Sequence, residues 1–238
     1  MKTQKDKNKI QDNKLKFYDK RKLLLETIPF IICLVLFLGA IAYYPKLPSV
    51  IPTHWNALGE VDGYGGRGTI FIIPIVLLVI LILFLILPMM EVFRENMITI
   101  YKYFYAFKIL FSLFFAGLFV AMILSILGYN INVSAVVIMM IGILFIAIGL
   151  ILPKLKRNFM FGIRTGWTLS SDLVWSKTHK IGGVLFALIG AIIIAMIFIV
   201  KLEVLFWVFI GLIFAVSLFL VFYSYYLYKE TYKKTKEK

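Results

Sequence analysis

Six long apolar runs, separated by short polar segments, dominate the pattern of this sequence. Each run is about 20 residues long, enough for a helix to cross the roughly 30 Å hydrocarbon core of a bilayer. The runs are apolar on every face, so they lack the alternation expected of strands in a membrane barrel. We therefore predict an all-α polytopic membrane helical bundle of about six transmembrane helices. The predicted spans are Leu23–Tyr44, Thr69–Met90, Phe104–Gly128, Val133–Leu152, Ile181–Val200 and Val204–Tyr228.

Lys and Arg residues are distributed unevenly between the polar segments. Of the 26 in the chain, 23 fall in one alternating set of segments and three in the other. Because cytoplasmic segments carry the excess of basic residues, both termini are predicted to be cytoplasmic. The net charge of +14 then reflects topology and contact with anionic membrane lipids, and no direct nucleic-acid binding is predicted.

The same segments predict how the chain is organised. A basic cytoplasmic leader covers residues 1–22, and a basic cytoplasmic tail covers 229–238. Between them we expect a two-helix membrane unit at 23–90, with an extracytoplasmic loop at 44–68. A four-helix membrane unit follows at 91–228, with a cytoplasmic loop at 153–180. The single cysteine, Cys33, has no partner for a disulfide.

Few ionisable residues lie within the predicted spans. Glu26 and Lys108 fall near the cytoplasmic ends of the first and third, where Lys108 is expected to extend its ammonium group toward the interface. Ionisable groups at membrane depth usually mark ion pathways or catalysis. Their scarcity argues against an ion-coupled transporter or an intramembrane protease. We expect no enzymatic activity and no cofactor.

The predicted extracytoplasmic loop combines prolines, glycines and polar residues. Pro45, Pro48 and Pro52 prevent a regular helix, so an extended or turning chain is expected. Such a loop can be held by its own hydrogen bonds with an aromatic anchor at the headgroups, or it can recognise a ligand outside the cell. A cation site at His54 and Asp62 fits no standard spacing, so no metal is predicted. The candidate outer residues are His54, Trp55, Asn56, Gly59 and Asp62.

The predicted cytoplasmic loop begins with basic residues alternating with aromatic ones, which is typical of a membrane interface. Ser170 or Ser171 can then cap a short helix that runs directly into the fifth span. On that helix Trp175 and His179 are four residues apart and share one face. Arg164 stands apart from the other basic residues and can bind a phosphate, a carboxylate or an aromatic ring.

Both loops resemble a known family. The cytoplasmic loop is similar to the signature of Sdp-type toxin immunity proteins, the SdpI family. Its matching positions are Asn158, Gly162, Ile163, Arg164, Thr165, Trp167, Thr168, Trp175, Thr178, His179 and Gly183. The outer loop resembles an uncharacterised membrane domain that often precedes this signature, with matches at Leu47, Pro48, Ile51, Pro52, His54, Asn56, Gly59 and Asp62. One position departs from the pattern, since Gly166 stands where the family usually has proline.

The resemblance implies a function that composition does not. Family members protect a bacterial cell from a secreted peptide toxin that attacks the membrane. Some are thought to signal by holding a cytosolic transcriptional repressor at the membrane. The resemblance therefore implies a multi-pass protein of the bacterial plasma membrane, with a toxin partner outside and a repressor as a partner inside. A toxin would arrive at the outer loop. The cytoplasmic motif is therefore expected to be a transmission, docking or bracing element and not the toxin site itself.

Two other interpretations stay open at this stage. The chain can be a lipid-handling protein or a membrane enzyme that acts on a phosphorylated headgroup through Arg164, Trp167 and His179. It can also be an enzyme of the outer face that uses a metal at His54 and Asp62. Alternatively, the cytoplasmic motif is structural and satisfies broken helix ends. The sequence does not specify the oligomeric state.

Overall fold

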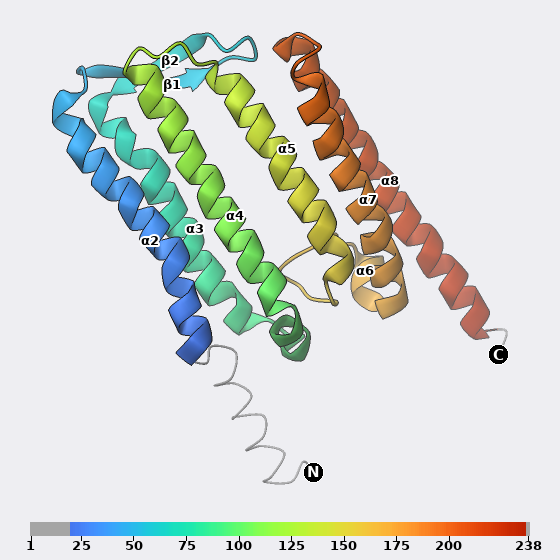
Figure 1. The fold of residues 1–238 in the computed structure, drawn as a ribbon. Helices are drawn as coiled ribbons and strands as arrows, with labels where there is room; N and C mark the ends of the chain where they lie inside the picture. Colours follow the sequence, from blue (N-terminus) through green and yellow to red (C-terminus); the bar gives the residue numbers. More distant parts are fainter. Residues whose placement is uncertain (1–19, 237–238) are drawn as a thin grey trace.

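The computed structural model describes residues 20–236 as a row of long helices with a small β-hairpin across one end (Figure 1). Within the described residues, six helical segments are long and apolar enough to cross a membrane, which confirms the predicted all-α polytopic bundle. Most of the predicted leader, residues 1–19, lies outside the described residues, as do residues 237–238 of the tail.

The long helices are α2 (Lys20–Tyr43), α3 (Ile72–Ile86), α4 (Arg94–Ile126), α5 (Val133–Ile151), α7 (Asp172–Met196) and α8 (Leu202–Lys236). A short helix, α6 (Gly166–Ser170), precedes α7. The hairpin consists of antiparallel β1 (Val50–Trp55) and β2 (Val61–Gly66). One-turn 3₁₀ segments that begin with Tyr44-Pro45, Leu87-Pro88 and Leu152-Pro153 follow α2, α3 and α5. Proline cannot continue a helix, so these positions end the apolar runs.

Two helices begin well before the predicted spans. α4 begins at Arg94 instead of residue 104, and α7 begins at Asp172 instead of residue 181. In α7 the side chain of Ser171 accepts a hydrogen bond from the amide of Val174, which confirms the predicted cap and the short helix leading into the fifth span. Hydropathy detects only the apolar part of a helix, so it missed the polar turns at the start of α4, whereas the capping residues had indicated those of α7.

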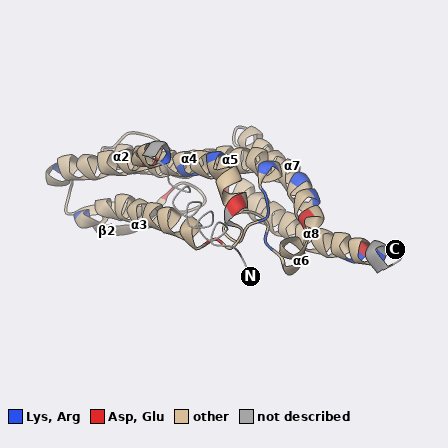
Figure 2. Ribbon diagram, turned by 90° about the horizontal axis from the view of Figure 1, so that it is seen from below, with Lys and Arg blue, Asp and Glu red and all other residues tan. Residues whose placement is uncertain are grey.

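Charge is sparse along the helices. Viewed from the end at which α2 begins and α8 ends, most of the ribbon bears no charged residue (Figure 2). The ends of the described chain, at the start of α2 and the end of α8, lie at the end of the bundle opposite the hairpin (Figure 1). This arrangement fits the predicted topology, in which the hairpin is extracytoplasmic. We call the hairpin end the outer end and the opposite end the inner end.

Three groups of buried residues hold the bundle together. One joins α2, α3 and α4 beneath the hairpin, around Ile51, Ile70 and Leu77. A second joins α4 to the cytoplasmic loop and α7 at the inner end, around Phe104, Leu155 and Trp175. The third lies between α5, α7 and α8.

Glycines bring α5 and α7 into backbone contact. A Cβ atom added at Gly149 would lie 2.6 Å from the carbonyl oxygen of Gly183, and one added at Gly183 would lie 2.6 Å from the carbonyl oxygen of Gly149. Gly142 and Gly190 face each other in the same way farther along the two helices. Small residues at helix interfaces allow such close approach in lipid, where packing replaces the hydrophobic effect.

The predicted position of the Lys108 side chain is wrong. Lys108 is only 1% exposed and forms an ion pair with Glu26, which is also buried. The phenol of Tyr101 donates a second hydrogen bond to the same carboxylate oxygen at 2.7 Å. The early start of α4 places Lys108 near the middle of that helix, so its ammonium group binds a partner on α2 instead of reaching the interface.

Candidate functional site

The outer end is organised by a tight turn between β1 and β2. The side-chain oxygen of Asn56 accepts hydrogen bonds from the amides of Leu58 at 2.9 Å and Glu60 at 3.0 Å. Gly59 has a φ of +88°, a left-handed conformation that favours glycine. The turn is anchored to the bundle because the hydroxyl of Ser134, in the first turn of α5, donates to the carbonyl of Asn56 at 2.9 Å.

Two of the candidates in the outer loop, His54 and Asp62, form a pair. His54 and Asp62 come from opposite strands, and their Nδ1 and Oδ1 atoms are 2.5 Å apart. Both side chains remain accessible, with exposed fractions of 70% for His54 and 44% for Asp62. Within residues 20–236 there is no cluster of three or more His, Cys, Asp or Glu residues able to hold a metal ion. A catalytic zinc site commonly uses three protein ligands, so this pair alone fits such a site poorly.

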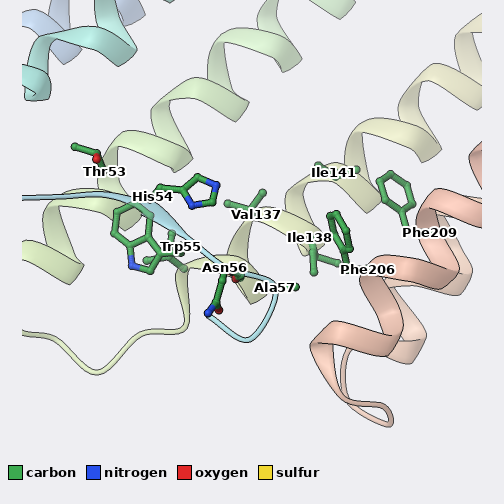
Figure 3. A pocket seen from close by; sticks show the side chains of 12 residues that line it. Thr53, His54, Trp55, Asn56, Ala57, Val137, Ile138, Ile141, Phe206 and Phe209 are labelled. Atoms are coloured by element: carbon green, nitrogen blue, oxygen red, sulfur yellow. The ribbon is translucent and has the colours of Figure 1, made fainter. Parts of the chain in front are cut away.

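A pocket of about 290 Å³ lies beside the turn (Figure 3). The hairpin forms one wall, and helices α5 and α8 form the others. The residues that line it are Thr53, His54, Trp55, Asn56, Ala57, Val133, Ser134, Val137, Ile138, Ile141, Phe206 and Phe209. The structure thus brings His54, Trp55 and Asn56 to one cavity, while Gly59 and Asp62 support it from the turn and the second strand.

At the inner end, Asn158 shapes the start of the cytoplasmic motif. Its side chain is fully buried and makes four hydrogen bonds to the backbone. The side-chain oxygen accepts from the amides of Met160 at 2.9 Å and Phe161 at 2.6 Å. The side-chain nitrogen donates to the carbonyls of Lys156 at 2.8 Å and Phe161 at 3.0 Å. Asn158 therefore fixes the conformation of the loop that precedes Gly162–Thr165.

Trp175 and His179 lie on one face of α7, as their spacing predicts, with ring centroids 3.9 Å apart. The Nε2 atom of His179 accepts a hydrogen bond from the amide of Ile163 at 2.9 Å, and its Nδ1–H donates to the carbonyl of Trp175 at 2.8 Å. The indole of Trp175 donates to the carbonyl of Leu155 at 2.9 Å. Both ring nitrogens of the buried histidine are thus occupied by backbone groups, which leaves neither available as a catalytic base.

Gly162 allows the loop to pass over this histidine. Its φ is +123°, and a Cβ atom there would overlap the ring of His179. Thr165 and Thr168 form a reciprocal capping box at the start of α6. The hydroxyl of Thr165 also shares a 3.1 Å hydrogen bond with Ser224 of α8. These contacts lock the motif to two helices of the bundle.

The remaining motif residues differ in accessibility. Trp167 contacts the ring of Tyr225 on α8, with centroids 5.1 Å apart. Thr178 is buried, and its hydroxyl finds no hydrogen-bond partner among the described residues. Arg164 is exposed, and its guanidinium donates to the carbonyl of Phe159. Of the predicted inner residues, Arg164 thus carries an accessible charge.

Sequence reasoning missed the residues that fasten the motif to α4 and to the segment just before it. The buried carboxylate of Glu91 accepts hydrogen bonds from the amides of Phe93 at 2.9 Å and Phe159 at 2.8 Å. The side chain of Asn96 donates to the carbonyl of Arg157 at 2.7 Å. A single acidic or amide residue at the end of an apolar run is common, so no signal in the sequence distinguished these two.

Comparisons with known proteins match the two regions that hold these sites. Residues 154–224 match the SdpI/YfhL protein family, and residues 31–78 match a domain of unknown function (DUF1648). The resemblance to the SdpI family is confirmed. The chain is 28% identical over 148 residues to the "Immunity protein SdpI" of Bacillus subtilis (strain 168), which covers 62% of this chain and 69% of that protein. No solved structure matches.

Each of the two matched regions contains residues of one of the two sites described above. The first runs from α2 through the hairpin into α3 and includes the His54–Asp62 pair. The SdpI-family region begins just before Asn158 and ends at Ser224, the residue of α8 that binds the cap of α6. It therefore contains the whole locked motif, all of α7 and most of α8.

Proposed function

We propose that this chain is an integral membrane immunity protein that protects a bacterial cell from a secreted peptide toxin. The similarity to an immunity protein, together with the SdpI-family match over the cytoplasmic motif, carries the proposal. The arrangement of the bundle supports it, because an accessible hairpin and a pocket lie together at the predicted outer end. The protein acts in the plasma membrane by binding, without catalysing a reaction.

The proposal assigns different roles to the two membrane units. The unit at 23–90 presents the hairpin to the toxin. The unit at 91–228 supplies the second side of the pocket through α5 and α8, and it holds the cytoplasmic motif. Neither unit forms the pocket alone, so both are required for protection.

Survival of a toxin-sensitive strain tests this function. Cells that express the chain should survive a panel of secreted Sdp-type peptides at concentrations that kill cells carrying the empty vector. Membrane insertion is checked by fractionation, and topology by reactivity of a cysteine placed at Tyr64 in the hairpin. If the inserted protein protects against none of the peptides, the immunity proposal is wrong.

A second function, signalling to a cytosolic repressor, is favoured by one observation. Arg164 is exposed within an otherwise locked motif, and a fixed guanidinium suits an acidic surface on a partner. Arg164→Glu should abolish recruitment of such a repressor to membranes while toxin protection persists. Equal recruitment by the wild type and the variant would rule out this role for Arg164.

The geometry gives less support to the alternative functions. Catalysis by His179 conflicts with the occupation of both its ring nitrogens. The lipid-handling alternative rests on Arg164, Trp167 and His179 acting together. Of these three, Arg164 alone is exposed, while Trp167 packs on Tyr225.

A further inference from the structure

The pocket beside the hairpin has mainly apolar walls. Val137, Ile138 and Ile141 of α5 face Phe206 and Phe209 of α8, and the hairpin closes the third side (Figure 3). The polar groups at its edge already have partners, since Asn56 and Ser134 bind each other and the turn. The cavity therefore offers an occupant apolar contact more than unsatisfied hydrogen-bonding groups.

The size of the pocket limits what can enter. Its volume of about 290 Å³ lies at the bottom of the range of roughly 300–1,000 Å³ typical of small-molecule sites. A single large side chain fits such a volume, whereas a folded peptide does not. The remainder of a peptide ligand would then lie across the hairpin and the exposed ends of α5 and α8.

Three carboxylates lie near residues that line the pocket. Asp62 binds His54, and Glu60 accepts a hydrogen bond from the side chain of Asn56 at 3.1 Å. Glu203 is exposed and precedes the lining residue Phe206 by three positions on α8, so the two lie on the same side of the helix.

Two of the three nearby cations lie away from these carboxylates. Lys46 and Arg67, at the opposite end of the hairpin strands, lie over the rings of Tyr43 and Tyr44. Lys201, just before α8, is the remaining basic residue in the outer segments of the sequence. Because Lys201 is two positions from Glu203, the excess of negative charge lies at the turn, with Glu60 and Asp62, and this side of the rim favours a ligand with a positive charge.

We propose that this pocket receives one aromatic or branched aliphatic side chain of an extracytoplasmic peptide, and that the carboxylates at its rim bind a cationic group next to that side chain. This inference rests on the proposed immunity function and defines what the outer site recognises. Electrostatic attraction of this kind speeds association and contributes specificity, and added salt weakens it.

A matched pair of tryptophan substitutions on α5 tests the pocket. Ile141→Trp fills the cavity, whereas Ile143→Trp adds the same bulk at a position on the same helix that is 46% exposed and outside the pocket lining. Binding of a fluorescently labelled Sdp-type peptide is measured with the full-length protein in lipid nanodiscs. We expect at least a tenfold loss of affinity for Ile141→Trp and less than a twofold change for Ile143→Trp.

A cysteine footprint tests the same point without filling the cavity. In a Cys33→Ser background, the peptide should slow the reaction of a thiol reagent with Ile141→Cys at least fivefold and leave Ile143→Cys unaffected.

A double variant, Glu60→Gln and Glu203→Gln, tests the charges. It should lower the affinity for the peptide at low salt and reduce the dependence of that affinity on salt concentration.

The outcomes separate this inference from the proposed function. If the wild-type protein binds and protects while both tryptophan variants behave like it and the footprint is absent, the pocket assignment is wrong and the immunity function stands. If the wild-type protein neither binds nor protects, both proposals fall. If peptide binding does not depend on salt and resists the two glutamine substitutions, the requirement for a positive charge is wrong.

Discussion

The same local motif occurs at both ends of the molecule in opposite environments. The side-chain oxygens of Asn56 at the outer end and Asn158 at the inner end each accept hydrogen bonds from two backbone amides that follow in the chain. Asn158 is fully buried, whereas Asn56 and the turn around it are partly exposed. The hydrogen bonds of Asn158 hold the inner loop in place. Those of Asn56 hold the outer turn, beside which His54, Asp62 and a pocket remain accessible. Recognition of a ligand requires such accessible groups.

The largest effect on stability is expected from the ion pair that joins α2 to α4 in the inner half of the bundle. Lys108→Ala leaves the carboxylate of Glu26 buried without its cation, which should cost about 3–5 kcal/mol. Thermal unfolding in detergent and abundance in membranes measure this cost. Lys102→Ala, at an exposed position on the same helix, is the control. A Lys108→Ala protein as stable as this control would show that the pair contributes nothing to the fold.

Asn158→Ala should have the next largest effect. It removes four hydrogen bonds and leaves the amides of Met160 and Phe161 without acceptors, at a cost of about 2–4 kcal/mol. Asn56→Ala removes the equivalent bonds where water can replace them, so about 1 kcal/mol or less is expected. Parallel melting curves compare the two variants. Equal losses would contradict the distinction between a structural inner end and an accessible outer end.

His54→Ala should change stability little and binding more. An exposed pair such as His54–Asp62 contributes about 0–1 kcal/mol to folding, so the variant should insert and melt like the wild type. The His54 side chain lines the pocket, so protection against the toxin should fall. A variant that melts normally and still protects fully would remove His54 from the recognition site.

A smaller change, this time a gain in stability, is expected at the departure from the family pattern. Gly166 is the first residue of α6, and a Cβ atom there meets nothing within 4 Å. Thr165 before it is extended, with φ −117° and ψ 163°, as a residue preceding proline should be. Gly166→Pro should therefore stabilise the protein by about 0.4–1 kcal/mol. A lower melting temperature would show that the turn needs the freedom of glycine.

The sequence predicted the elements that depend on local patterns. Apolar runs located the six helices, and the spacing of Trp175 and His179 placed both on one face. It did not predict the partners of Lys108 or Glu91, because those contacts join residues more than 60 positions apart. The helical walls of the outer pocket were missed for a related reason. Its walls are ordinary aliphatic and aromatic residues of α5 and α8, and only the packing of the bundle brings them beside His54 and Asn56.

Photocrosslinking from the two ends tests the central claim most directly. A benzoylphenylalanine is introduced at His54 in one protein and at Arg164 in another, and an Sdp-type peptide is added outside intact cells. The peptide should crosslink to position 54 and not to position 164. Crosslinking at position 164 without crosslinking at 54, or at neither position in cells that are protected, would contradict recognition at the outer end.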